Sequence, residues 1–334
     1  MESYLTLAYA GIIAFGVFMY VLMDGFDLGV GILFRTAPTD RDRDVLMNSL
    51  APIWDGNETW LVLGGAGLLG AFPQAYSILL SAFYLPLSVM LIALIFRGVA
   101  FEFRFKANRS RYLWDIAFNL GSAIAAFAQG VVLGAFVQGV DVVARQYAGG
   151  PFDWLTPFSL VTGVAMMVGY ALLGVTWLIV KTDGALQDWA YGIAMRLVFG
   201  VVVFMAIISL WTPMMDHQIA ERWFSWPNIA FLSPVPVAVG IVTFGLHRAI
   251  RAKREVAPFV LAMVMFLLGY IGLAISLWPN VVPPSISIWE AASAVESQRF
   301  LIYGFVILLP VILGYTSYTY WVFRGKVSAD EGHY

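Results

Sequence analysis

Four acidic side chains lie within long apolar runs near the N-terminus. Asp24 and Asp27 occur in the sequence Asp-Gly-Phe-Asp-Leu-Gly-Val-Gly, and Asp55 and Glu58 occur in Trp-Asp-Gly-Asn-Glu. In each pair the acids are three residues apart, which places both on one face of a helix. A carboxylate within a membrane is disfavoured by several kcal/mol unless it is hydrated, paired or protonated. The two pairs, with Asn57 beside the second, therefore indicate a proton path or a cation site.

Apolar residues dominate the whole chain, so these acids belong to a membrane protein. Of the 334 residues, 60% are hydrophobic and 12% are charged, and the mean hydropathy is +0.81. A soluble domain has about 25% charged residues, so this chain cannot cover itself with a wetted surface. A cytosolic enzyme, a secreted domain and a nucleic-acid binder are thereby excluded.

Nine segments are long enough to cross a membrane as helices, for which about 20 apolar residues are needed. Their runs are continuous rather than alternating, which favours helices over a barrel. We therefore expect an all-α, polytopic membrane protein with about nine transmembrane helices, forming a single membrane-embedded domain over residues 1–334. The expected spans are Leu5–Leu33, Pro52–Phe72, Tyr76–Arg97, Trp114–Gly139, Pro157–Val180, Tyr191–Trp211, Ile229–His247, Pro258–Trp278 and Phe300–Phe323.

Basic residues predict the orientation. Fifteen Lys and Arg residues fall at the loops on one side of the expected spans, and three fall on the other side. Cytoplasmic loops carry the excess of Lys and Arg, so we expect the N-terminus outside (periplasmic) and the C-terminus in the cytoplasm. The first run follows no basic n-region, so we expect it to be retained rather than cleaved. The fifteen are Arg35, Arg41, Arg43, Arg97, Arg104, Lys106, Arg109, Arg111, Lys181, Arg248, Arg251, Lys253, Arg254, Arg324 and Lys326.

This orientation puts all four acids in the cytoplasmic half of the membrane. If the first helix continues to Arg35, Asp24 and Asp27 lie about 16 and 12 Å inward, at about 1.5 Å per residue. The second pair begins the next helix, which leaves the same loop. The alternative is that the acids cap helices or pair with Arg35 and Arg97 near the membrane surface. Asp55 follows Pro52 by three residues, which suits an N-terminal cap.

Metal ligands are scarce. The chain has no cysteine, which excludes disulfides, thiolate metal sites and iron–sulfur clusters, and it has three histidines, His217, His247 and His333. His217 and His247 are expected on opposite sides of the membrane, so they cannot hold one haem between them. We expect no metal in this chain. Gln129 and Gln138, both within the fourth expected span, are interpreted as interhelical hydrogen-bond partners.

Several motifs resemble subunit II of the bacterial cytochrome bd quinol oxidases, in particular the cyanide-insensitive branch. The likeness runs from end to end and is most specific in the two acidic motifs, since apolar runs seldom contain Asp-Gly-Phe-Asp or Trp-Asp-Gly-Asn. The stretches that carry it are Asp24–Gly31, Asn48–Asn57, Phe96–Arg104, Trp289–Ser293 and the last span up to Tyr320 and Trp321.

The resemblance implies a nine-helix subunit that pairs with subunit I in the inner (cytoplasmic) membrane of a bacterium. Two b-type haems and one d-type haem, together with the quinol-oxidising loop, belong to subunit I, and this chain binds no cofactor by itself. A structural quinone or lipid and a small single-span accessory subunit are further expected partners. The complex oxidises quinol, reduces oxygen to water and takes its protons from the cytoplasm.

The resemblance also implies roles for individual residues. A proton path would use Asp24, Asp27 and Asp55, together with Glu58 and Glu102. Glu58 is Gln in some relatives, and Glu102 lies in a basic stretch where a surface ion pair is the alternative role. The supporting residues would be Trp54, Asn57 and Arg97.

Two other functions are compatible with the same acids. One is a stand-alone proton- or cation-coupled transporter. Such proteins usually place their site near the bilayer midplane between repeated halves, whereas these acids gather toward one side and no repeat is visible. The other is a purely structural subunit that tolerates the acids at its interface.

Overall fold

The computed structural model describes residues 2–329, and within them nine helices have 18 or more residues. Eight of the nine are long and apolar enough to cross a membrane, and the exception is α3. The nine are α1 (Glu2–Leu33), α3 (Trp54–Ala71), α4 (Pro73–Phe103), α5 (Arg111–Gln138), α6 (Pro157–Lys181), α7 (Gly184–Met215), α10 (Pro234–Arg251), α11 (Ala257–Leu277) and α13 (Val295–Val322).

The all-α, membrane-spanning fold is thus confirmed, with one long helix in each of the nine expected segments. Helix α3 is less apolar because its first two turns contain Asp55, Asn57 and Glu58. Its 18 residues correspond to about 27 Å, close to the thickness of the hydrocarbon core. The count of nine spans and the direction in which they cross remain predictions.

Two boundaries differ from expectation, and the first concerns a residue expected at the site. Helix α4 continues beyond the expected end at Arg97 to Phe103, so that Glu102 lies inside a helix and not in a loop. The reason is local, because Gly98 is the one strongly unfavourable helix residue between Arg97 and Phe103. The seventh expected span is interrupted at Ser233, where the short helix α9 gives way to α10.

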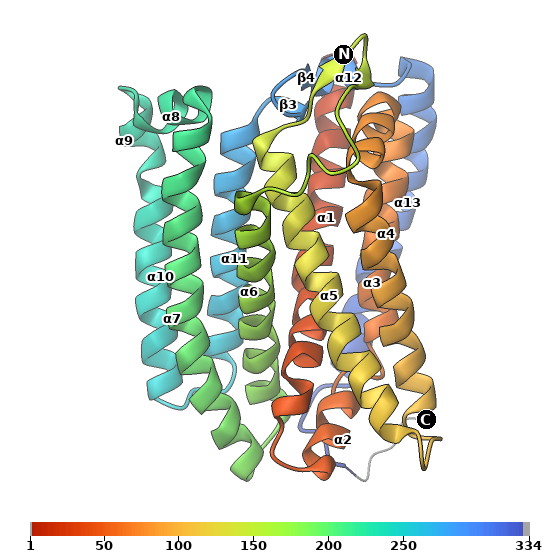
Figure 1. Ribbon diagram of the computed structural model, residues 1–334, viewed down its shortest axis with the longest axis vertical. Helices are drawn as coiled ribbons and strands as arrows, with labels where there is room; N and C mark the ends of the chain where they lie inside the picture. Colours follow the sequence, from red (N-terminus) through yellow and green to blue (C-terminus); the bar gives the residue numbers. More distant parts are fainter. Residues whose placement is uncertain (1, 330–334) are drawn as a thin grey trace.

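Short elements close the two ends of the bundle (Figure 1). One end, here called the basic end, has the turns between α4 and α5, α6 and α7, and α10 and α11, together with the helix α2. The other end has two β-hairpins and three short helices. These elements are η1 (Phe34–Thr36), α2 (Asp40–Asn48), β1 (Val142–Val143), β2 (Gln146–Tyr147), α8 (His217–Phe224), α9 (Asn228–Leu232), β3 (Asn280–Val282), β4 (Ile286–Ser287) and α12 (Ile288–Ala291).

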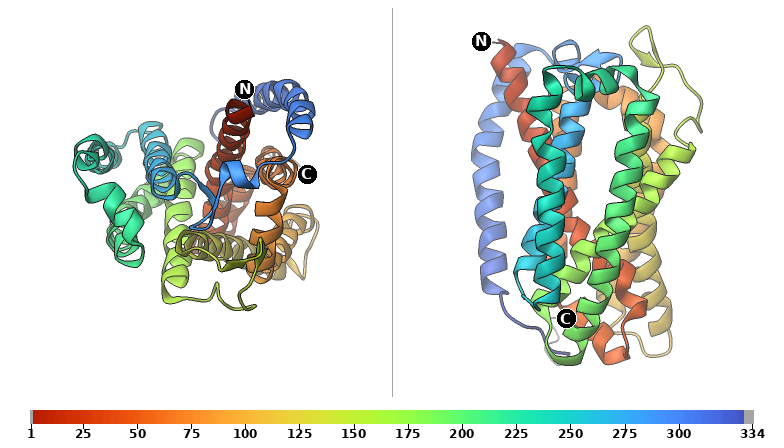
Figure 2. Two further views of the ribbon diagram at one scale, coloured as in Figure 1. Left: turned by 90° about the horizontal axis from the view of Figure 1, so that it is seen from above. Right: turned by 90° about the vertical axis from the view of Figure 1, so that its left-hand side faces the viewer.

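Helix α1 lies at the centre of the arrangement and packs against α3, α5, α6, α11 and α13. Seen from above, α7 and α10 lie at one edge of the molecule and α13 at another (Figure 2). Asp24 and Asp27 lie on this central helix. Both acids therefore face neighbouring helices and are fully buried.

The contact between α1 and α6 depends on two glycines. A Cβ atom at Gly29 would lie 1.8 Å from the carbonyl oxygen of Tyr170, and one at Gly174 would lie 2.3 Å from the backbone nitrogen of Val30. The two backbones therefore touch, as small residues allow in membrane helices. This crossing lies between Asp27 and the basic end and holds the acidic turn of α1 in place.

A buried arginine fastens the basic end. The Nε atom of Arg104 lies 2.5 Å from Asp115 of α5, and its Nη1 atom lies 2.6 Å from Asp44 of α2. Arg111 also pairs with Asp44, and Arg43 lies 3.6 Å from Asp115. Two carboxylates thus neutralise the buried guanidinium, as buried charges require, and they tie α2 to the turn between α4 and α5.

We predict that Gly29→Ala prevents normal packing of α1 on α6. Overpacking costs about 1–3 kcal/mol, and here the obstacle is backbone, which cannot rotate away. The melting temperature or the yield of the purified protein should fall clearly. Gly11→Ala on the same helix is the control, since a Cβ there meets nothing within 4 Å. Equal stability of the two variants would show that the crossing is looser than described.

Candidate functional site

Three carboxylates from two helices surround one guanidinium from a third helix. The Nη1 atom of Arg97 on α4 lies 2.9 Å from Oδ1 of Asp24 and 3.6 Å from Oε2 of Glu58 on α3, and its Nη2 atom lies 3.6 Å from Oδ2 of Asp27. Arg97, Asp24 and Asp27 are fully buried. We call Arg97, Asp24, Asp27, Glu58 and Asn57 together the Arg97 cluster.

The charges of the Arg97 cluster do not balance. With all groups ionised, the three carboxylates around Arg97 leave two negative charges uncompensated. Removing charges from water is costly, and only good ion pairing or hydrogen bonding offsets it. The cluster therefore needs bound protons, a further cation or water to be stable at this depth.

Hydrogen-bonding capacity in the cluster is also unused. Within residues 2–329, Oδ1 of Asp27 and Nε of Arg97 are buried and have no hydrogen-bond partner. Buried polar atoms are nearly always satisfied by protein or by ordered water. These atoms can therefore bind water between the carboxylates, which is what a chain of proton transfers requires.

Asn57 connects α1, α3 and α13. Its Nδ2 atom donates to Oδ2 of Asp27 at 2.8 Å, and its Oδ1 atom accepts from the hydroxyl of Tyr320 at 2.8 Å. An ionised carboxylate can only accept hydrogen bonds, so this arrangement fixes which way the amide points. Tyr320 lies 263 residues from Asn57 in the sequence, and no sequence pattern linked the two.

Exposure decreases stepwise from the surface into the cluster. Asp55 is exposed in the first turn of α3 at the basic end, the side chain of Glu58 is 28% exposed, and Asp24 is fully buried. Asp55 forms no ion pair with Arg97 within the described residues. Asp55 lies at the start of α3, where a negative charge stabilises the positive end of the helix dipole. This position therefore also agrees with the alternative role of Asp55 as a helix cap.

Trp54 supports the cluster indirectly. Its ring stacks on Phe101 with 4.8 Å between centroids and 6° between planes. The guanidinium carbon of Arg97 lies 5.8 Å from the centre of the same Phe101 ring. Phe101 therefore connects Trp54 to Arg97.

Glu102 lies apart from the Arg97 cluster. It is near the end of α4, its side chain is 47% exposed, and it pairs with Lys106 at 3.1 Å. This placement matches the surface ion pair that was the alternative for this residue. Arg35, the other arginine considered as a partner for the acids, is exposed.

Two tyrosines near Asp24 were not anticipated. Gln129 of α5 donates to the hydroxyl of Tyr20 at 2.8 Å and accepts from the hydroxyl of Tyr170 at 2.8 Å. Gln129 is thus an interhelical hydrogen-bond partner, as expected, and so is Gln138, which accepts from Thr156 at 2.5 Å. Buried tyrosines usually find a partner for the hydroxyl, but the sequence does not indicate which one.

Two of the three histidines, His217 and His247, lie far apart. His217 is exposed at the start of α8, whereas His247 is in the part of α10 nearest the basic end, so the two are at opposite ends of the bundle. No group of three or more His, Cys, Asp or Glu side chains suited to a metal ion occurs within residues 2–329. His333 lies outside the described residues.

These features define a multi-pass, α-helical membrane protein with a buried guanidinium among carboxylates. The chain belongs to the cytochrome bd terminal oxidase subunit II family, whose model matches residues 5–323. It is therefore a component of a quinol oxidase complex that reduces oxygen. The resemblance to this family is thus confirmed, whereas the cyanide-insensitive branch remains a prediction.

Individual relatives match along nearly the whole chain. The Escherichia coli (strain K12) cytochrome bd-I ubiquinol oxidase subunit 2 is 29% identical over 351 residues, covering 93% of this chain and 92% of its own. The Bacillus subtilis (strain 168) cytochrome bd ubiquinol oxidase subunit 2 is 30% identical over 327 residues, covering 93% and 94%. The fold matches the bd oxidase structure from Geobacillus thermodenitrificans with a TM-score of 0.78 at 16% identity, covering 96% and 98%.

We predict that Arg97→Met strongly destabilises the chain, because it leaves buried carboxylates without their cation. Breaking a buried ion pair costs about 3–5 kcal/mol. Adding Asp24→Asn to the same chain should restore part of the loss, since one negative charge is then removed. Thermal unfolding of the purified protein measures both effects.

The exposed Arg35→Met is the control and should change little. If Arg97→Met is as stable as this control, the guanidinium is not the counter-ion of the cluster. If Asp24→Asn makes Arg97→Met worse, the account of the charges is wrong.

Proposed function

We propose that this chain is the haem-free subunit II of a cytochrome bd-type quinol oxidase in the inner membrane of a bacterium. It supports subunit I by packing and supplies part of the path that brings protons from the cytoplasm to the site of oxygen reduction. The observation that carries the proposal is the Arg97 cluster, which combines buried, incompletely paired carboxylates with a graded exposure toward the basic end. The proposed functional unit is one membrane-embedded domain over residues 1–334.

The basic end supports the proposed direction of proton uptake. It contains the exposed Asp55. Fourteen of the fifteen basic residues lie in its turns, in its short helices or at the adjoining ends of the long helices, and Arg97 lies farther inside α4. Cytoplasmic loops carry such an excess, so the basic end would face the cytoplasm and the N-terminus the outside. Protons would then enter at Asp55, pass Glu58 and reach Asp24 and Asp27.

The roles within the path differ by position. Asp24 and Asp27 would accept and release protons through water, while Arg97 and Asn57 hold them in place. Asp55 and Glu58 would collect protons nearer the surface. Glu102 would act at the surface beside Lys106, outside the buried part of the path.

The haems are assigned to subunit I in this proposal. His217 and His247 lie at opposite ends of the bundle and cannot ligate one haem from its two faces. The two b-type haems and the d-type haem would supply the electron transfer and oxygen chemistry, and this chain would hold and deliver protons. A small single-span subunit, lipid and a structural quinone are further proposed partners.

Two rival functions make different predictions. A stand-alone transporter would be isolated without haem-bearing partners, and membership in the oxidase family speaks against it. A purely structural subunit would keep full oxidase activity when its buried acids are neutralised. Isolation of the protein therefore tests the transporter, and substitution of the buried acids tests the purely structural subunit.

We predict that a tagged chain, extracted in mild detergent, elutes with a second large membrane protein that shows b- and d-type haem bands. The preparation should take up oxygen when given quinol. Mass spectrometry of the eluted chains and a visible spectrum check this. A colourless protein that elutes alone from several mild detergents would support the transporter.

We predict that Asp27→Asn and Asp55→Asn both lower quinol-driven oxygen uptake. For Asp27→Asn the loss should be on the order of tenfold or more, because a positioned proton-transfer group contributes at least that much to the rate. The haem spectrum should stay unchanged. Asp188→Asn is the matched control, since Asp188 is an exposed acid paired with Lys253 at the same end. Full turnover of both Asp27→Asn and Asp55→Asn would leave the chain with a structural role alone.

A further inference from the structure

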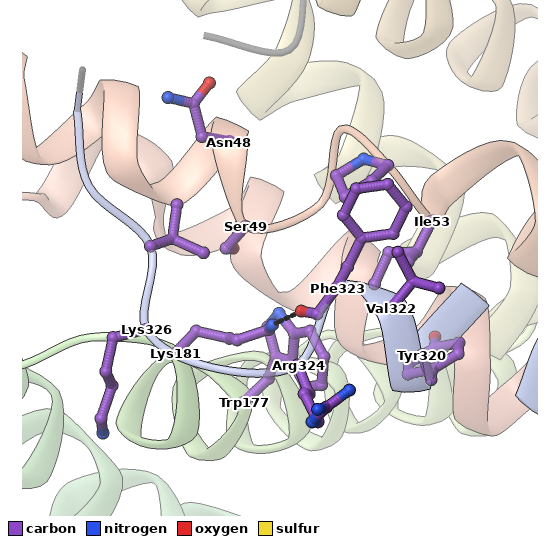
Figure 3. Close-up of a pocket in the computed structure, with 12 residues that line it drawn as sticks. Asn48, Ser49, Ile53, Trp177, Lys181, Tyr320, Val322, Phe323, Arg324 and Lys326 are labelled. Carbon is purple, nitrogen blue, oxygen red and sulfur yellow. Dashed lines mark hydrogen bonds between the residues drawn. The ribbon is translucent and has the colours of Figure 1, made fainter. Parts of the chain in front are cut away.

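A cavity of about 180 Å3 lies at the basic end between three parts of the chain (Figure 3). Its walls come from the turn between α2 and α3, from the end of α6, and from α13 with the segment that follows it. The side chains that matter here are those of Ser49, Ile53, Trp177, Lys181, Tyr320 and Phe323. A water molecule occupies about 30 Å3 in the liquid, so the cavity can hold several.

The cations around the cavity do not converge on its interior. Lys181 donates to the carbonyl oxygens of Phe323 at 2.5 Å and Gly325 at 3.2 Å, which caps the end of α13. Lys326 pairs with Glu255 at 3.0 Å. Hydrogen bonds from Lys326 and Gln187 hold the pKa of Glu255 below its usual range, so this pair stays charged. The charged ends of Arg324 and Lys326 point away from Ser49 and Ile53 (Figure 3).

The inner wall of the cavity touches the Arg97 cluster. Tyr320 lines the cavity, and its hydroxyl donates to Asn57, which in turn donates to Asp27. Two hydrogen bonds of 2.8 Å each thus separate the cavity from a buried carboxylate. The remaining oxygen of Asp27, Oδ1, has no hydrogen-bond partner within residues 2–329.

We propose that this cavity is a second aqueous approach to the cluster, with Tyr320 and Asn57 as its inner gate. The proposal rests on the proposed proton path and adds a route that lies within this chain, between α6 and α13. It is separate from the approach along α3 through Asp55 and Glu58. Water in the cavity would be continuous with the cytoplasm.

The chemistry requires the gate to move. An amide keeps its hydrogens at neutral pH, so Asn57 cannot pass a proton along the hydrogen bonds that it makes. When the Tyr320 hydroxyl and the Asn57 amide rotate away, water from the cavity reaches Asp27. A hydronium ion then gives one proton to the carboxylate: an O–H bond of hydronium breaks, an O–H bond forms on Asp27, and neutral water remains.

The chain itself offers a direct test of the cavity, because it has no cysteine. Ser49→Cys places a thiol in the cavity wall, and Ser122→Cys places one at an equally buried position outside the cavity. The intact complex, in vesicles with the basic end accessible, is treated with a small charged methanethiosulfonate reagent. The mass of this chain reports labelling, and quinol-driven oxygen uptake reports function.

We expect Ser49→Cys to be labelled at least tenfold faster than Ser122→Cys, and the label to lower turnover severalfold with the haem bands unchanged. Ala252→Cys, in an exposed turn at the same end, is the control that should be labelled without loss of turnover. Equal labelling of positions 49 and 122 overturns the aqueous cavity. Rapid labelling at position 49 with full turnover overturns its role as an approach.

Tyr320→Phe tests the gate. We expect it to change turnover severalfold, because the hydroxyl that holds the gate closed is lost. Tyr318→Phe, on the exposed side of α13, should leave turnover unchanged. In a chain that already carries Asn57→Ala, Tyr320→Phe should have no further effect, because both act through one hydrogen bond. Additive effects of Tyr320→Phe and Asn57→Ala, or turnover of Tyr320→Phe equal to that of Tyr318→Phe, overturn the gate. If Asp27→Asn keeps full turnover, the proton path itself fails, which is a separate result from those at positions 49 and 320.

Discussion

A single buried guanidinium among three carboxylates is the interaction on which the site depends. Arg97 can neutralise one of its partners, Asp24, at close range, and it lies farther from Asp27 and Glu58. The excess of acid over base is unfavourable in a membrane unless protons or water compensate. The same excess that makes the site costly therefore gives it the capacity to exchange protons, and a neutral pair in this place would lack that capacity.

The surrounding fold keeps these groups together from distant parts of the chain. The backbones of α1 and α6 touch at Gly29 and Gly174, which leaves no space for the acidic turn of α1 to shift. At the basic end, Arg104 binds α2 to α5 through Asp44 and Asp115. A membrane protein gains little from apolar contact between helices, because lipid is equally apolar. Close backbone contact and buried ion pairs are therefore the interactions that hold the helices of this fold together.

Much of this could be predicted from sequence because the membrane imposes strong rules. Apolar runs of about 20 residues predict helices, and acids such as Asp24 within them indicate a site. Contacts between distant segments follow no such rule. Arg97 was among the expected partners of the acids, but which acids it reaches depends on how α4 packs against α1 and α3. The hydrogen bond from Tyr320 depends on how α13 packs beside α3. The side chain of Glu102 is exposed because of the direction in which it leaves α4, and the local sequence does not determine that direction.

The central claim is that Asp24 and its neighbours carry protons during oxygen reduction. The most direct test is a single-turnover reaction of the fully reduced complex with oxygen, in vesicles that contain a pH dye on the side of the basic end. Haem oxidation and proton uptake are followed together in the native complex and in Asp24→Asn. The account predicts that oxygen binding and the first electron transfer stay normal while proton uptake slows at least tenfold. Proton uptake at the native rate in Asp24→Asn would contradict it.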